Sequence, residues 1–274
     1  MNENKIVLTN GPLAVVLIQI QFSPILQIAK FIPAIQDELR RKKYPLFNQI
    51  QGEDVLALPF GGVEKRKIEQ WVFSSNDYSK NIIIDNQKIT YQVFDCDNYK
   101  YESFVKDFIT VVQSFNSVVD ISSFVRLGLR YINAIPEKRD LSWKSLIKKD
   151  FHGIDFPKEV EWIGEPLIVF SIQRGVRLKN LGETISNFHL NIYQHPDGAK
   201  YPQDIMRFFT EESDFYEDKP LVTFIDLDNY ILFNAADRDE IFAQLEGLFN
   251  GLHKAIGEVF FKSLITEEAL EVWQ

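Results

Sequence analysis

The stretch of this sequence that decides the fold is FVRLGLRYINAI, residues 124–135. Its alternating pattern predicts a β-strand, because successive side chains of a strand point to opposite faces of a sheet. The residues on the apolar face would be Val125, Leu127, Leu129, Tyr131 and Ile135. The other face would carry Arg126, Gly128 and Arg130, so that two arginines flank a glycine on one side of a sheet.

Polar residues at alternate positions of other predicted strands extend this arginine face. They lie in the stretches 166–178 and 186–195. If these strands are neighbours, their side chains form a lane of hydrogen-bond donors. Such a lane suits a carboxylate, a phosphate or an acidic strip of a protein, because arginine binds oxyanions in a bidentate manner. The candidate ligand-binding residues of this lane are Arg126, Arg130, Gln173, Arg177, His189 and Tyr193.

The same arginines also have a purely structural interpretation. LVTFIDLDNY, residues 221–230, places Asp226 and Asp228 on one face of another predicted strand, as two ion pairs within the sheet would require. Gly128 would then make room for a large neighbouring side chain. We favour structural pairing of the two arginines, and a ligand-binding role in addition to pairing stays open.

Hydrophobic periodicity predicts the other elements. In the first half, the predicted strands are 13–22, 55–58, 69–75, 81–85 and 88–95, with a tight hairpin at 85–87. The predicted helices of that half start at Pro24, after Ser23 as N-cap, and at Glu102. In the second half, the predicted strands are 123–135, 166–178, 186–195 and 221–234, with a short helix after Asp140 and a long one from near Asp237.

Both halves therefore have the order β-α-β-β-β(-β)-α, without a repeat at the level of residues. The expected fold class is α+β, with two lobes in which a mainly antiparallel sheet grips a long helix. The N-terminal lobe would be residues 1–120 and the C-terminal lobe residues 121–274, with an acidic insert near 199–218. No Pro/Gly/Ser-rich linker separates the lobes, so we expect them to pack tightly or to share one sheet as a single domain.

The overall composition limits the classes of function. The chain has 274 residues and a net charge of −9, which disfavours general affinity for the phosphate backbone of nucleic acids. The single Cys96 excludes an internal disulfide and a cysteine-rich zinc site, so a cytoplasmic location is expected. The N-terminal apolar run is interrupted by Gln19 and Gln21, and we expect neither a signal peptide nor a membrane span.

Catalytic and metal-binding patterns are weak in this sequence. The common motifs of serine hydrolases, P-loop proteins, zinc proteases and dinucleotide-binding enzymes are missing. PFGGVEKRK, residues 59–67, could cradle a phosphate, but a loop with solvated charges is the simpler interpretation. His189 and His195 would lie roughly 20 Å apart along a strand, too far for one metal ion. His253 is expected to be a packed or capping residue. We therefore predict no catalytic residue, no metal and no cofactor, and a non-enzyme rather than an enzyme.

Several segments, spread over nearly the whole chain, recur in a known pattern. They are PLAVVLIQIQFSP (12–24), the strand around Trp71–Phe73, FVRLGLRYINAI, and LHKAIGEVFFKSLITEEALEVW (252–273). They resemble a sporadically distributed family of uncharacterised bacterial proteins of about this length. A PL-x-x-V opening, an R-x-G-x-R-Y-I-N strand and a C-terminal H-x-x-x-x-x-x-F helix recur in that family. The resemblance implies a bacterial cytoplasmic protein and, through the patchy distribution, a mobile defence or toxin–antitoxin setting. It implies no particular activity.

The function expected from the sequence is a binding or regulatory module. Its partner would be another protein, a second copy of the chain or a small anionic ligand, and not a membrane. Two alternatives stay open: an enzyme acting on a phosphorylated or nucleotide substrate, and a nucleic-acid-binding protein, which only RRKK (40–43) and KRK (65–67) favour. A deep pocket with convergent polar groups would favour the enzyme, a flat apolar patch the protein partner, and a continuous positive stripe the nucleic acid.

The C-terminal segment SLITEEALEVWQ, residues 263–274, predicts a short amphipathic helix. Thr266 suits the N-cap position, and the two glutamates after it suit a first helical turn. We therefore predict that Trp273 is buried, either against the body of the protein or against a second subunit.

Overall fold

The structure is a computed structural model that describes residues 8–57, 63–94, 96, 97, 99–138, 141–153, 168–178, 183–194, 202, 205 and 221–274. These residues form helices and runs of consecutive strands that pair in an antiparallel sheet, so the predicted α+β class is confirmed. The acidic insert at 199–218 lies outside the described residues except for Pro202 and Ile205.

The first half consists of a curved set of strands and two α-helices. Its strands are β1 (Leu13–Phe22), β2 (Leu46–Ala57), β3 (Val63–Ser74), β4 (Lys80–Ile84) and β5 (Lys88–Val93). Its helices are the 3-10 turn η1 (Ile28–Lys30), α1 (Ile32–Arg41) and α2 (Tyr101–Val119). The predicted strand 55–58 is only the end of β2, whose polar first part has no alternating apolar pattern.

The segment after β1 differs from the prediction. The helix begins at Ile32 and not at Pro24. Ser23 does not cap a helix, because its hydroxyl lies 2.6 Å from the hydroxyl of Ser123 and its backbone N–H donates to the Ser123 carbonyl. These bonds tie the end of β1 to the neighbouring strand before the chain can turn into a helix. The hairpin predicted at 85–87 is confirmed, since it joins β4 to β5.

The second half follows the predicted order closely. Its strands are β6 (Ser123–Pro136), β7 (Ile168–Arg177), β8 (Ile185–Gln194) and β9 (Val222–Asp237). Its helices are α3 (Trp143–Leu146), the 3-10 turn η2 (Lys149–Phe151), α5 (Arg238–Glu258), the π-helix η4 (Val259–Leu264) and α6 (Glu267–Trp273). The strands and the long helix predicted for this half are therefore confirmed, with small shifts at their ends.

The described strands form one antiparallel sheet in the order β2-β3-β4-β5-β1-β6-β9-β8-β7. β1 pairs with β6, with Ile18 opposite Leu129, so the two halves meet in the middle of the sheet. The prediction of a separate sheet for each lobe is therefore wrong, and the alternative of one shared sheet is correct. The division into domains at residues 120 and 121 stays a prediction.

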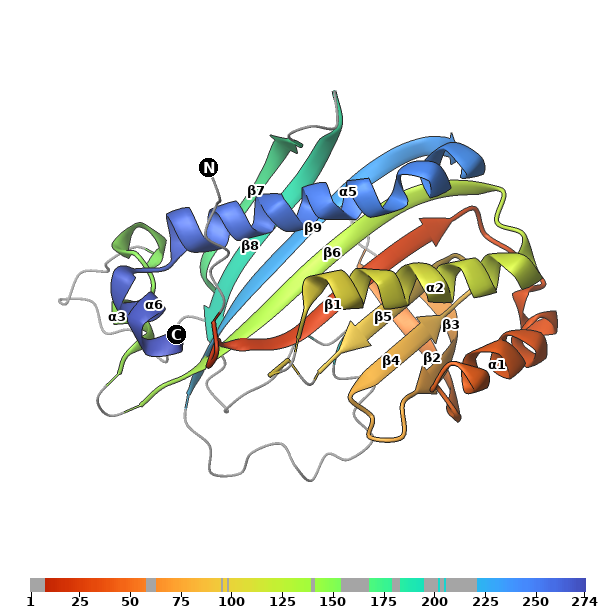
Figure 1. The fold of residues 1–274 in the computed structure, drawn as a ribbon, viewed down its shortest axis with the longest axis horizontal. Coiled ribbons are helices and arrows are strands. Elements are labelled where there is room, and N and C mark those ends of the chain that lie inside the picture. The colour runs from red at the N-terminus through yellow and green to blue at the C-terminus, as the bar shows by residue number, and fades with distance from the viewer. Residues whose placement is uncertain are drawn as a thin grey trace.

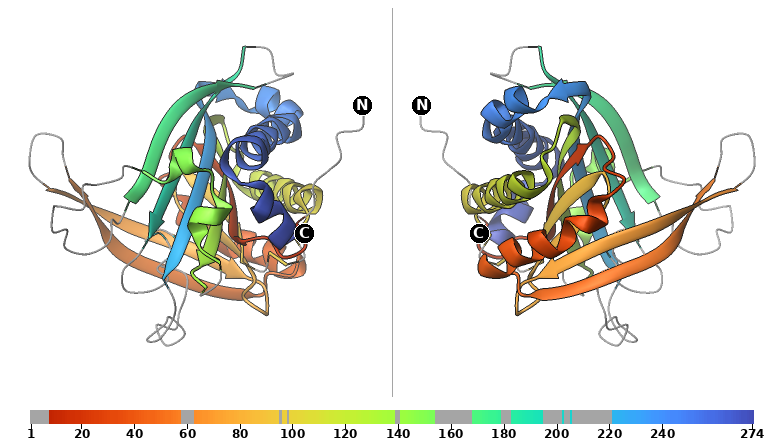
Figure 2. Two further views of the ribbon diagram at one scale, coloured as in Figure 1. Left: turned by 90° about the vertical axis from the view of Figure 1, so that its left-hand side faces the viewer. Right: turned by 90° about the vertical axis from the view of Figure 1, so that its right-hand side faces the viewer.

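The long helices α2 and α5 lie side by side on one face of this sheet, with α1 next to α2 (Figure 1). The outer strands curve away from these helices, so the opposite face of the sheet lies inside the curve (Figure 2). We call this opposite face the second face. Its character matters for function because none of α1, α2 and α5 covers it.

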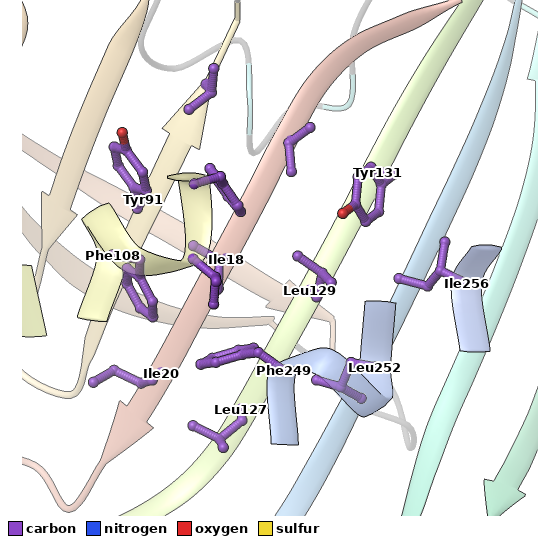
Figure 3. Close-up of a cluster of buried hydrophobic side chains, with 14 of the residues drawn as sticks. Ile18, Ile20, Tyr91, Phe108, Leu127, Leu129, Tyr131, Phe249, Leu252 and Ile256 are labelled. Carbon is purple, nitrogen blue, oxygen red and sulfur yellow. The ribbon is translucent and has the colours of Figure 1, made fainter. Parts of the chain in front are cut away.

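The core between the helices and the sheet is rich in aromatic and branched side chains (Figure 3). Phe108 of α2 is fully buried, and its ring centroid lies 5.7 Å from that of Phe249 on α5. The predicted apolar faces of both long helices are confirmed by the burial of Phe104, Phe108, Val111, Val112 and Phe115 on α2 and of Leu245, Leu248, Phe249, Leu252, Ile256 and Phe260 on α5 and η4.

The C-terminal helix docks on its own chain. Thr266 accepts a hydrogen bond from the N–H of Ala269, as expected of an N-cap. Trp273 is 5% exposed and stacks on Phe260, and its carbonyl accepts from the N–H of Asn10. The predicted burial of Trp273 is confirmed. Among the described residues, no helix combines the length and the apolar character that crossing a membrane requires.

Candidate functional site on the second face of the sheet

The strand register places most of the candidate residues in adjacent rows on the second face. One row, from β1 to β7, consists of Leu17, Arg130, Asp228, His189 and Gln173. The next row consists of Gln19, Gly128, Tyr230, Asn187 and Gly175. Beyond it, Arg126 lies between Gln21 and Leu232. The sheet therefore brings Arg126, Arg130, His189 and Gln173 together within three rows.

The two arginines are held by the two aspartates of β9. Arg130 binds Asp226 in a bidentate manner, with Nε 2.8 Å from Oδ1 and Nη2 2.7 Å from Oδ2. Arg126 donates from Nη2 to Oδ2 of Asp228 at 3.1 Å and from Nη1 to Oε1 of Gln19 at 2.8 Å. The predicted pairing of these arginines with Asp226 and Asp228 is confirmed.

Gly128 explains how Arg126 reaches its partner. The direct neighbour of Arg126 on β9 is Leu232, so its side chain must cross the row of Gly128 and Tyr230 to meet Asp228. A Cβ at position 128 would lie 2.5 Å from Nη1 of Arg126. The guanidinium carbon lies 4.2 Å from the centre of the Tyr230 ring, within the range of a cation–π contact. The absence of a side chain at Gly128 therefore leaves the space through which Arg126 reaches Asp228.

The electrostatics of the second face follow from these pairs. Burial lowers the pKa of Arg126, an effect that Asp228 opposes. Burial also raises the pKa of the Asp228 carboxyl, which the charge of Arg126 opposes. Two arginines and two aspartates cancel, so the lane is polar but not cationic. The guanidinium groups of Arg126 and Arg130 each have a carboxylate partner already, so an oxyanion would have to compete for them.

The other candidate residues do not converge with the arginines on a single point. Nε2 of His189 lies 3.3 Å from the hydroxyl of Tyr230, and Gln173 is exposed beside His189. Tyr193 stacks on Phe224 within a small apolar cluster at one end of the face. Arg177 forms an ion pair with Glu183 near the hairpin between β7 and β8.

Two exposed aliphatic residues on the second face were missed by the sequence interpretation. The pairing of β8 with β9 ends at Asn187 and Tyr230, and Ile185 and Leu232 lie two residues beyond that pair, on the second face of their strands. Ile185 is 54% exposed and Leu232 is 57% exposed. The alternation of β9 could have placed Leu232 on the same face as Asp226 and Asp228, but nothing in the sequence indicated its exposure.

The exposure of the second face is uneven. Over β3, β4 and β5 its polar side chains are buried, namely those of Gln70, Ser74, Asn81, Thr90 and Gln92. Over β6, β9, β8 and β7 most polar side chains of this face are half-buried or exposed, with Asp226 as a buried exception. The accessible part of this face therefore belongs mainly to the second half of the chain.

Catalytic or metal-binding constellations do not emerge from the described residues. No group of three His, Cys, Asp or Glu side chains within them is placed to hold a metal ion. His253 is packed, as predicted, with its ring centroid 3.7 Å from that of Tyr101 and its Nδ1 2.9 Å from the hydroxyl of Tyr131. His195 lies outside the described residues, as does the Gly-Gly pair of the loop at 59–67.

Comparisons with known proteins add no further constraint. No model of a known protein family matches the chain, and a search of curated proteins gave no significant match. The function must be argued from the geometry of the fold.

Proposed function

We propose that this protein is a non-enzymatic binding module and that a protein partner docks on the second face over β8 and β9. The proposal rests mainly on the exposure of Ile185 and Leu232, which are 54% and 57% exposed and lie on that surface, each two residues beyond the last pair of β8 and β9. Single exposed aliphatic side chains are common on soluble proteins, whereas contiguous apolar patches mark interaction surfaces.

The surface next to this aliphatic pair has the composition of a protein interface. Arg126 and Tyr230 stack on each other, with Arg126 directly beside Leu232 on the neighbouring strand. Arginine and tyrosine are enriched among the residues that dominate binding free energy. The ion pair with Asp228 fixes the guanidinium before a partner arrives, so less side-chain freedom is lost on binding. Covering the exposed parts of the two aliphatic side chains would contribute about 1 kcal/mol each.

Charge weighs against the alternative functions at this surface. An oxyanion would have to compete with Asp226 and Asp228 for the two arginines. Nucleic acid would meet a chain of net charge −9 and a lane whose four charged residues cancel. No described constellation favours catalysis over binding. A protein partner needs no excess charge, because charged residues are depleted in the cores of protein interfaces.

The cellular location and the biological context of the interaction are part of the same proposal. The resemblance to the sporadically distributed bacterial family implies a mobile defence or toxin–antitoxin context, and the single Cys96 favours the cytoplasm. On this proposal the partner is therefore a cytoplasmic protein of the same cell or a second copy of the chain.

Affinity purification from the native host, quantified by mass spectrometry, tests the proposal. The informative variant is the double substitution Ile185→Asp with Leu232→Asp. The matched control is Val272→Asp, which introduces a charge at a residue that is 41% exposed on α6, away from the second face. We expect a protein that is enriched by the wild type and by the control and lost with the double variant.

Size-exclusion chromatography with light scattering identifies the case in which the partner is a second copy. The wild type would then be a dimer and the double variant a monomer, which also supports the docking surface. Equal recovery of the same proteins with all three forms, together with an unchanged molecular mass, would contradict it. Circular dichroism melts of the three forms show whether the variants are folded.

A further inference from the structure

A cleft of about 280 Å³ lies between the end of β7 and the last turns of α5, where the helix continues into η4. It is separate from the ion-paired lane of the second face, because α5 packs on the opposite face of the sheet (Figure 1). Its polar lining consists of Arg177, Lys254, Glu258, Lys262 and Ser263. Val176, Leu178 and Ala255 supply apolar wall, and Gly251 adds no side chain to fill the space.

The charge of the cleft is opposite to that of the whole protein. Lys254 and Lys262 line the cleft with a single carboxylate, Glu258, and Arg177 at its edge is paired with Glu183, so the lining keeps a positive excess although the chain carries a net charge of −9. Lys262 lies 3.7 Å from Glu258, and the side chain of Lys262 is 69% exposed. Exposed ion pairs of this kind contribute little, so the cations remain available to a ligand. Within the described part of the chain, Lys254 forms no ion pair.

The backbone at the cleft is also unusual. η4 is a π-helix, closed by the hydrogen bond from the N–H of Ile265 to the carbonyl of Phe260. A π turn holds one more residue than an α turn and so rotates the side chains that follow by about 100° around the helix. Such turns are rare and occur frequently at functional sites. Here the turn contributes Lys262 and Ser263 to the lining.

The helix dipole does not reverse this charge. The negative end of the helix lies beyond Leu264, whereas Lys254 and Gly251 lie more than two turns before it. The dipole effect falls off within the last turn. The cationic side chains therefore determine the sign of the potential in the part of the cleft nearest Lys254.

We propose that this cleft binds a small ligand carrying an oxyanion, either a phosphate ester or a carboxylate. The cationic side chains and the hydroxyl of Ser263 would hold the anionic group, and the apolar wall would contact the rest of the molecule. The volume of about 280 Å³ leaves room for a small molecule. This proposal does not depend on the docking of a protein partner on the second face.

Nuclear magnetic resonance titration of the full chain tests the proposal, with glycerol phosphate and butyrate as probes. Saturable shifts of the amides of Gly251, Lys254 and Ser263 are expected with at least one of the two probes. Shifts with only one probe assign the ligand class. The double variant Lys254→Gln with Lys262→Gln should weaken binding about tenfold or more, since it removes two charge-assisted hydrogen bonds to the anionic group.

The matched control is Lys106→Gln, which removes one positive charge from an exposed position of α2. It should leave the affinity of the cleft unchanged. The proposal is overturned if neither probe gives saturable shifts at the cleft, or if Lys106→Gln weakens binding as much as the double variant. The variant Lys254→Gln with Lys262→Gln should still recover the protein partner in the affinity purification. A failure of the ligand proposal can therefore be distinguished from a failure of the proposed docking surface.

Discussion

The substitution Phe108→Ala should be among the most damaging changes to this protein. Phe108 is 0% exposed and packs from α2 of the first half against Tyr91 of β5 and Phe249 of the second half. Replacing a buried phenylalanine by alanine removes its transfer free energy and leaves a cavity, which together cost about 3–5 kcal/mol. Because the lost side chain lies where both halves meet, we expect the whole sheet to unfold in one transition at a lower denaturant concentration.

Urea unfolding followed by both circular dichroism and tryptophan fluorescence measures this effect. The control is Phe47→Ala, because Phe47 of β2 is 42% exposed and should cost about 1 kcal/mol or less. A double-mutant cycle with Phe249→Ala should give a coupling of about 0.5–1.5 kcal/mol for the edge-to-face pair. A loss below about 1 kcal/mol for Phe108→Ala, or two separate transitions, would refute the reasoning.

Three further predictions concern ion pairs, the C-terminus and pH. Arg130→Ala should cost about 3–5 kcal/mol in urea melts, because it leaves Asp226, only 6% exposed, without its bidentate partner; Arg177→Ala, in an exposed pair, should cost less than about 1 kcal/mol. Deleting residues 267–274 should lower the stability by a few kcal/mol at every protein concentration, since Trp273 docks on its own chain; a loss of stability on deletion that changes with protein concentration would contradict docking in cis. Hydrogen bonds from Ser75 and Ser79 lower the pKa of Asp77 to about 2. The stability from this carboxylate is therefore complete above its ordinary pKa of 3.8 and is lost as the pH falls towards about 2, so Asp77→Asn should flatten the acid limb of the melting profile, and an unchanged limb would count against it.

The arginine pairing and the helix faces were predictable from the sequence because both follow from local periodicity. Alternation put Arg126 and Arg130 on one side of β6 and the aspartates on one side of β9, and short-range spacing selected the buried face of α2. A Thr266 N-cap and an amphipathic turn were enough to predict the docking of Trp273. In each case the information lies within one element or in two neighbouring strands.

Features that depend on distant parts of the chain were not predictable. Ser23 and Pro24 form a good helix start in isolation, but the bonds to Ser123, a hundred residues away, hold them in another conformation. The first part of the edge strand β2, residues 46–52, lacks an alternating pattern because its side chains are half-buried or exposed. The single sheet arises from the pairing of β1 with β6, for which the sequence has no marker.

The cleft beside η4 was likewise not predictable from the sequence, because distant parts of the chain form it. Its lining comes from β7, α5 and η4, and the residues involved form no motif in the sequence. Of these residues only Arg177 was a candidate, and it was assigned to the lane on the second face. The register places Arg177 opposite Ile185 on the second face, and its side chain pairs with Glu183 and with none of the other lane residues.

Hydroxyl-radical footprinting of the complex with the recovered partner tests the central claim, docking on the second face, most directly. The readout is the labelling of individual side chains in the free and the bound protein. The account predicts that labelling of Ile185, Leu232 and Tyr230 falls on binding, while labelling of Val272, on α6, stays unchanged. Unchanged labelling of Ile185 and Leu232 in a complex that is fully formed would contradict the claim.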